Sequence, residues 1–248
     1  MLVAFVASLS LAQVAAATSL LLVHADSGSY ATGAQAAMVA TGRFTTVDTY
    51  DANSVTPTLA YLSGYDAILA WTNYIPSDRI GLGDVLADYY ELGGKALTVA
   101  TYSFSDPWSL RGELTTPPFV GLTNLGTNGD VSGLLSAVVP GDVIFNGINL
   151  AAVSYYHNSN FAHPGLGAGA QLLATDGAGI YMIARSANGV INVNLFPGYI
   201  SGNNDEFYNL LANTFQPGGP PPVPEPGSML LLGTGLVGLG RVWRKRRK

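Results

Sequence analysis

Between residues 19 and 103, short apolar runs alternate with stretches of helical character. The first run, SLLLVHAD, is continuous, which is typical of a strand buried on both faces of a sheet. Strands are predicted at residues 19–26, 45–52, 65–73 and 95–103. Helices are predicted at 32–42, which ends at Gly42, and from a Ser77 or Asp78 cap to Leu92. Strands that alternate with helices predict right-handed crossovers and a parallel sheet.

After Asp106 the pattern is weaker, because Gly, Pro, Asn and Thr dominate residues 107–170. In that region the weak signals predict a short helix near 131–139 and strands at 143–148 and 151–156. Clear strands return at 171–175, 179–186 and 189–196, and a helix is predicted at 205–215. Only two residues separate the last two strands, which predicts an antiparallel hairpin. The predicted fold is α/β, with a mostly parallel sheet, helices on both faces and an antiparallel C-terminal hairpin.

The two ends of the chain differ in composition from this body. Residues 1–17 are apolar and end in three alanines, as a secretory signal peptide does, although they lack the usual positive start. The body is expected to form one domain over residues 18–216, which is long enough to bury a core. A Pro- and Gly-rich linker at 217–222 is expected to act as a semi-rigid spacer before the last segment, 223–248.

The last segment joins a Pro-Glu-Pro turn, an apolar run at 229–240 and a cluster of cations. With its flanks the run reaches the length of about 20 residues that a membrane span needs, and the cations predict that its end stays in the cytoplasm. The body should then lie outside the cytoplasm. The residues of the turn are Val223, Pro224, Glu225 and Pro226, and those of the basic tail are Arg241, Arg244, Lys245, Arg246, Arg247 and Lys248.

These features together closely resemble the PEP-CTERM sorting signal of exopolysaccharide-producing Gram-negative bacteria. The resemblance implies export across the inner membrane and a transient membrane anchor. It also implies that an exosortase-type protease cuts near the Pro-Glu-Pro and passes the body to the cell surface or the extracellular matrix. The alternatives are a simple C-terminal anchor or an apolar tail packed on the domain, and the dense cations argue against packing.

Composition limits what the body can bind. Between residues 18 and 224 it carries five cations against fifteen carboxylates, a net charge of −10. Such a surface repels nucleic acid, whose binding relies on dense Lys and Arg, so no nucleic-acid partner is expected. The chain has no cysteine, which excludes disulfides, thiolate metal sites and a cysteine nucleophile.

The body also resembles the class I glutamine amidotransferase-like, flavodoxin-like fold, including its ThuA-like relatives. The resemblance rests on the first strand LLLVHAD, the strand YDAILAWTN, the strand GGKALTVATYS and the late strand NVNLFPG before a terminal helix. In that family a cysteine follows a strand within a Gly-x-Cys-x-Gly motif. Here Thr101, Tyr102 and Ser103 stand at that place, so the amidotransferase chemistry is not expected.

In a parallel sheet, polar and aromatic residues would gather at the carboxyl ends of the strands. The predicted ligand crevice is formed by His24, Asp26, Trp71, Asn73, Tyr102 and Ser103. Aromatic faces together with amides and carboxylates suit the hydroxyl groups of a sugar. The same aromatic residues are as well explained by packing in the core or at its rim.

Other chemistry is less well supported by the residues. A nucleophilic Ser103 would need His24 or His157 as its base, and no motif joins these residues. His157 and His163 are six residues apart, which is not a zinc spacing. We therefore predict no catalytic residue, no metal and no cofactor. The expected function is non-catalytic binding of a carbohydrate, with exopolysaccharide as the suggested partner, or of a protein. The alternatives are a hydrolase or carbohydrate-active enzyme that uses the same crevice, and a structural matrix component.

Overall fold

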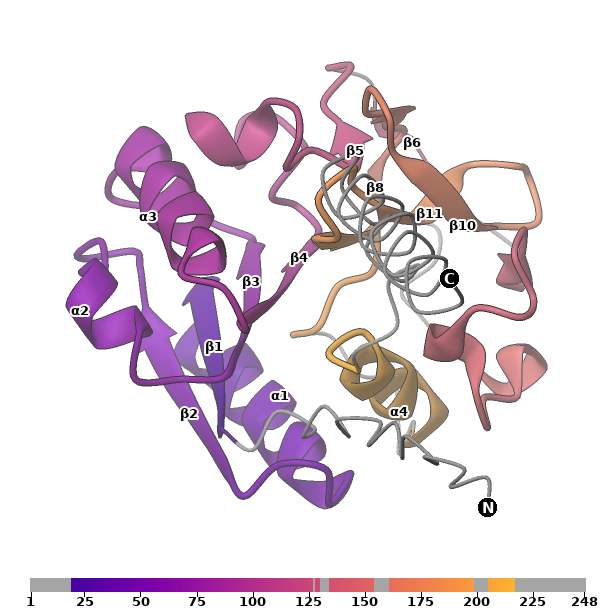
Figure 1. The fold of residues 1–248 in the computed structure, drawn as a ribbon, viewed down its shortest axis with the longest axis horizontal. Helices are drawn as coiled ribbons and strands as arrows, with labels where there is room; N and C mark the ends of the chain where they lie inside the picture. The colour runs from indigo at the N-terminus through magenta and orange to yellow at the C-terminus, as the bar shows by residue number, and fades with distance from the viewer. Residues whose placement is uncertain (1–18, 127, 130–133, 154–160, 199–204, 217–248) are drawn as a thin grey trace, which may run out of the picture. The chain divides into compact units, whose positions relative to one another are not determined.

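The computed structural model describes residues 19–126, 128–129, 134–153, 161–198 and 205–216, which build an α/β fold on an eight-stranded sheet (Figure 1). The strand order is β2-β1-β3-β4-β12-β11-β10-β7. The strands from β2 to β12 in this order run parallel, whereas β11, β10 and β7 are joined by antiparallel pairing. The strands are β1 (Ser19–Ala25), β2 (Thr46–Asp51), β3 (Ala67–Thr72), β4 (Ala96–Ala100), β7 (Ser136–Ala137), β10 (Gln171–Thr175), β11 (Tyr181–Arg185) and β12 (Ile191–Val193).

Shorter elements surround this sheet. Two antiparallel ladders join β5 (Leu122–Thr123) to β9 (Gly165–Leu166) and β6 (Asn128–Gly129) to β8 (Phe161–Ala162). The α-helices are α1 (Gly28–Ala40), α2 (Leu59–Leu62), α3 (Arg79–Glu91) and α4 (Asp205–Asn213). Three 3₁₀ turns are η1 (Glu113–Thr115), η2 (Val143–Phe145) and η3 (Leu150–Ala152).

Helices cover both faces of the sheet because successive side chains of a strand point to opposite faces. Leu20 and Leu22 of β1 pack in one core cluster with α1 and α4. Leu21 and Val23 pack in a second cluster with α2 and α3. Figure 1 shows these two pairs of helices on either side of β1 and β3. The predicted α/β class, the mostly parallel sheet and the hairpin of β11 and β12 are therefore confirmed.

Local signals explain where the helices begin and end. The Asp78 carboxylate accepts hydrogen bonds from the backbone N–H groups of Ile80 (3.0 Å) and Gly81 (2.9 Å), and so caps α3 as predicted. Gly93 and Gly94 follow α3 with φ of 76° and 67°, which side-chain-bearing residues rarely adopt. The short helix α2, capped by Thr58, was not predicted.

Three predictions in the weak middle region are wrong where the structure describes them. Residues 134–139 contain β7 rather than a helix, since Ser136 and Ala137 pair with β10 at the edge of the sheet. The predicted strands at 143–148 and 151–156 are instead η2 and η3. Asp142 and Asn149 cap these turns through their side chains, and such local bonds compete with strand pairing. Residues 131–133 and 154–156 lie outside the described part of the chain.

Candidate functional site

The connections of the sheet change direction beside β1. The chain leaves β1 through α1 to β2 on one side, then crosses to β3 on the other side. The carboxyl ends of β1 and β3 therefore flank a topological switch point, where parallel α/β sheets tend to bind ligands. His24 and Asp26 stand at the end of β1, and Trp71 and Asn73 stand at the end of β3.

At this point the Asp26 carboxylate accepts three hydrogen bonds and joins the loop after β1 to the end of β3. Its Oδ2 accepts a hydrogen bond from Trp71 Nε1 (2.9 Å), and its Oδ1 accepts bonds from Asn73 Nδ2 (2.9 Å) and the Ser27 backbone N–H (2.7 Å). Only 2% of Asp26 is exposed, and a Cβ added at Gly198 would lie 2.8 Å from Oδ2. A buried carboxylate with this many donors is well satisfied. The contacts thus hold the loops after β1 and β3 together.

His24 and Trp71 pack against each other in the same cluster, with their ring centroids 5.4 Å apart and their planes at 26°. Trp71 is 1% exposed, so both faces of its indole are covered and a sugar cannot stack on it in this conformation. Burial lowers the pKa of His24, against the opposing effect of Asp51 and Asp26. His24 is therefore held neutral around pH 7. Its Nδ1 is buried and makes no hydrogen bond to any described residue.

The other two residues of the predicted crevice follow β4. Tyr102 donates its backbone N–H to the Thr72 carbonyl (2.7 Å), and its ring packs on Trp108 and Phe196 at centroid distances of 5.2 and 5.7 Å. Ser103 is 2% exposed, and within the described chain its Oγ has no hydrogen-bond partner. The structure thus brings His24, Asp26, Trp71 and Asn73 into direct contact, and it places Ser103 at a different feature. Whether the cluster binds a ligand stays a prediction.

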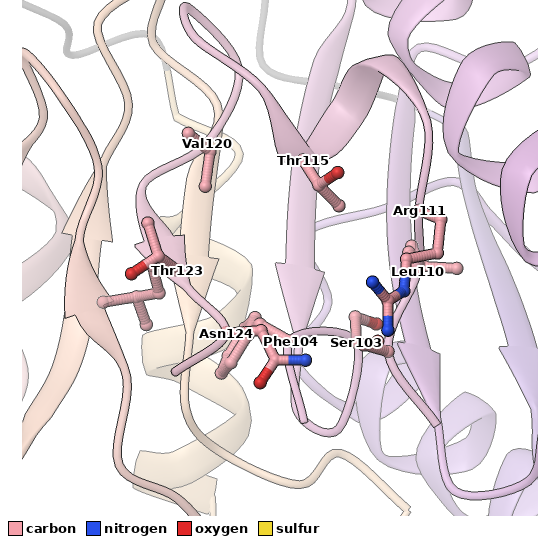
Figure 2. A pocket seen from close by; sticks show the side chains of 10 residues that line it. Ser103, Phe104, Leu110, Arg111, Thr115, Val120, Thr123 and Asn124 are labelled. Carbon is pink, nitrogen blue, oxygen red and sulfur yellow. The ribbon is translucent and has the colours of Figure 1, made fainter. Parts of the chain in front are cut away.

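That feature is a pocket of about 220 Å³ between the loop after β4 and the β5 region (Figure 2). Its lining mixes four hydroxyl groups, an amide and a guanidinium with apolar side chains. Figure 2 shows the Arg111 guanidinium and Ser103 on one side of it and Thr123 and Asn124 on the other. The lining residues are Ser103, Phe104, Ser109, Leu110, Arg111, Thr115, Val120, Leu122, Thr123 and Asn124.

An ion-pair network holds the Arg111 side of the pocket. Asp106 Oδ1 accepts bonds from Arg79 Nη2 (2.7 Å), Arg111 Nη2 (2.8 Å) and Ser109 Oγ (2.7 Å). Arg79 also donates to Ser109, through Nη2 to the hydroxyl and through Nε to the carbonyl. Hydrogen bonds from Ser109, Arg79 and Arg111 lower the pKa of Asp106 to about 2, so this carboxylate is ionised at neutral pH. One anion thus faces two cations.

This network was missed in the sequence. The signal that could have revealed it is the small number of cations, since Arg79 and Arg111 are two of only five Lys and Arg residues between residues 18 and 224. Arg111 also stands five residues after Asp106, in the loop that follows a strand of a parallel sheet. In an acidic body, a cation in such a loop is a stronger indication of a functional site than a cation on a helix surface.

Several predicted residues lie outside the described part of the chain: residues 1–17, His157, and all of 217–248 with the Pro-Glu-Pro turn and the basic tail. In the residues that the structure describes, no helix has the length and apolarity to cross a membrane. The same residues contain no group of three His, Asp or Glu side chains that could hold a metal ion.

Comparison with known families bears on the C-terminal segment. Residues 222–247 match the family model described as the PEP-CTERM protein-sorting motif. The chain carries a PEP-CTERM sorting signal. This confirms the resemblance drawn from the Pro-Glu-Pro turn, the apolar run and the basic tail, and it marks the chain as an exported protein that an exosortase processes. The motif implies export and membrane anchoring of the C-terminus before sorting. No curated protein matches the chain.

Proposed function

We propose that the body of this PEP-CTERM protein is a non-catalytic carbohydrate-binding module of the cell surface or extracellular matrix. The observation that carries the proposal is the pocket beside β4, whose Ser103 hydroxyl has no hydrogen-bond partner among the described residues. A buried polar atom without a partner loses the hydrogen bonds that it had in water, which costs about 1–3 kcal/mol. A ligand hydroxyl would restore such a bond once a small movement of the pocket wall exposes the covered Ser103 Oγ.

The size and lining of the pocket favour one sugar ring. A water molecule takes about 30 Å³ of liquid volume, so the 220 Å³ pocket has room for about seven waters. This is a small volume compared with the roughly 300–1,000 Å³ of sites for drug-sized ligands. The lining combines apolar side chains such as Phe104 and Leu122 with the hydroxyls of Thr115 and Thr123. Such a mixture suits a sugar ring, which has apolar C–H faces and a rim of hydroxyls.

The fold supports the location of this site. The order β2-β1-β3-β4-β12 of the parallel strands is the order of flavodoxin-like sheets, and we propose that the parallel half belongs to that class, as the amidotransferase-like relatives do. Ligands of such sheets bind beyond the carboxyl ends of the strands. The hydrolase alternative has less support, because neither Ser103 Oγ nor His24 Nδ1 bonds to a described partner, and a serine nucleophile needs a base in contact.

The test is calorimetric titration of the full chain, kept in a detergent without a sugar headgroup, with exopolysaccharide from its own host. We expect saturable binding heat. Ser103→Ala should weaken binding about 2- to 12-fold, which corresponds to the 0.5–1.5 kcal/mol of one hydrogen bond. The matched control is Thr101→Val, which removes another buried hydroxyl that has no partner in the described part of the chain and does not line the pocket. This variant should bind like the wild type.

The other outcomes separate the alternatives. Equal binding by Ser103→Ala and the wild type would refute the assignment of the pocket. Continuing heat after saturation would favour a carbohydrate-active enzyme. A chain that binds no polysaccharide would favour a structural matrix component.

A further inference from the structure

The charge of the pocket lining differs from the net charge of the body. Among the ten described residues that line it, Arg111 is the one that carries a charge. The body as a whole has a net charge of −10 between residues 18 and 224. A cation at the wall of a pocket in an acidic protein is favourable for an anionic ligand, since the general field of the protein would otherwise repel it.

The Arg111 guanidinium still has donors to offer. A guanidinium has five N–H donors. Within the described chain Arg111 bonds to Asp106 through Nη2 alone, at 2.8 and 3.0 Å, so the N–H groups on Nε and Nη1 remain. Its side chain is 50% exposed. The residue is thus fixed at one end by an ion pair and open at the other.

Asp106 does not neutralise Arg111 completely, because it is shared. Asp106 pairs with Arg79 at 2.7 Å and with Arg111 at 2.8 Å, so the trio keeps one positive charge. The nearby Asp84 carboxylate accepts the backbone N–H of Glu113 (2.7 Å). Neither Asp84 nor Glu113 lines the pocket. Arg79 holds Asp106 in place and is thereby a positioning residue for Arg111.

From this arrangement we propose that the pocket recognises an acidic sugar, with the carboxylate of a uronic acid residue bound by Arg111 and a ring hydroxyl bound by Ser103. The inference rests on the proposed function and specifies its ligand. Guanidinium–carboxylate pairs combine charge and directed hydrogen bonds, and they are stronger than bonds between neutral groups. Ser103 Oγ has no hydrogen-bond partner among the described residues and lies on the Arg111 side of the pocket (Figure 2). Because this oxygen is covered in the present conformation, one ring would meet both groups after a small movement of the pocket wall exposes it.

The experiment compares acidic sugars with neutral forms of the same size. The full chain, labelled with ¹⁵N and held in a zwitterionic detergent without sugar, is titrated with glucuronate, galacturonate and mannuronate, each paired with its methyl ester. The readouts are the dissociation constant and the NMR shift of the Arg111 Nε–H group. We expect at least one acid to bind about tenfold more tightly than its ester and to move that resonance. The preference should shrink between about 0.01 and 1 M salt, where the Debye length falls from about 30 to about 3 Å.

Two variants make the result specific to Arg111. Arg111→Met should bind the acid and the ester equally, while it keeps the affinity of the wild type for the ester. Arg43→Met removes the same charge at an exposed position outside the pocket, and it should keep the tenfold preference. Thermal unfolding of both variants checks that they are folded. If Arg111→Met does not fold, the Nε–H shift and the salt dependence of the wild type decide the question.

Failure of this inference can be told apart from failure of the proposed function. Equal affinity of the wild type for every acid and its ester would overturn the inference and leave a neutral-sugar module. Acetate that binds as tightly as the uronates would also overturn it, because the ring would then contribute nothing. If neither the monosaccharides nor the host polysaccharide binds, both the inference and the proposed function are wrong.

Discussion

Replacement of Asp26 by Asn tests whether the cluster at the switch point is a structural hub. The substitution keeps the shape of the side chain but leaves one acceptor oxygen and introduces an NH₂ group. All three partners of Asp26 are donors: Trp71 Nε1, Asn73 Nδ2 and the Ser27 N–H. Whichever way the amide turns, its NH₂ group faces a donor. The less costly orientation gives up the bond to Trp71 and keeps the two bonds at the Oδ1 position.

The expected loss of stability follows from these contacts. A buried donor without a partner costs about 1–3 kcal/mol. The two bonds that remain change from charge-assisted to neutral, which weakens them by about 1 kcal/mol each. The cost of burying an ionised carboxylate disappears at the same time and offsets part of this. We therefore expect Asp26→Asn to lower the free energy of unfolding by about 2–4 kcal/mol. For a domain of about 200 residues this corresponds to a drop in Tm of about 4–16 °C.

Urea unfolding of the full chain, followed by circular dichroism, measures this loss. The matched control is Asp88→Asn, an exposed carboxylate on α3 outside the cluster, which should change the stability by less than about 0.5 kcal/mol. Trp71→Phe should be destabilising alone and cost less in the Asp26→Asn background, because the shared bond is already lost. A loss below about 1 kcal/mol for Asp26→Asn would refute the view that this carboxylate holds the loops together.

Three further predictions concern charge. The folded-state pKa of His24 lies below its unfolded value of about 6.5, so the unfolded chain binds the proton first as the pH falls below that value. The free energy of unfolding should then fall by at most about 1.4 kcal/mol per pH unit. Urea unfolding of His24→Gln at pH 7 and pH 5 should lack this contribution. The pKa of Asp106, lowered from 3.8 to about 2, predicts that the wild type loses stability between about pH 4 and 2 and that Asp106→Asn loses less over this range in the same assay. The Arg185 and Asp142 side chains form an ion pair at 2.7 Å, each 7% exposed, so Asp142→Ala should cost about 3–5 kcal/mol in urea unfolding. Replacing both residues by Leu and Met should restore the part of the loss that comes from the unpaired Arg185, and should leave the loss of the η2 cap, about 1 kcal/mol. A double variant as unstable as Asp142→Ala would contradict this account of the pair.

The sequence alone was sufficient for the elements that signal themselves locally. The continuous run of β1, the Asp78 cap of α3 and the short link of residues 186–190 between β11 and β12 each depend on residues close in the chain. The PEP-CTERM signal is local in the same sense, since its turn, apolar run and cations occupy one segment. The prediction for the middle region failed because the strands there are two residues long and depend on partners far away in the sequence. β7 exists only through its pairing with β10, in which Ala137 faces Ala174 and Ser136 faces Thr175.

What the tertiary structure decided is which chemically active residues share a site. The sequence placed His24, Asp26, Trp71 and Ser103 in one crevice, because all of them follow parallel strands. The packing separates them: the first three form a buried contact, and Ser103 lies in the pocket with Arg111. Strand order and burial depend on contacts between residues far apart in the chain, and no periodicity of the sequence records them. The sequence therefore determined the parallel strands and the export address, and only the fold determined which side chains are covered and which line the pocket.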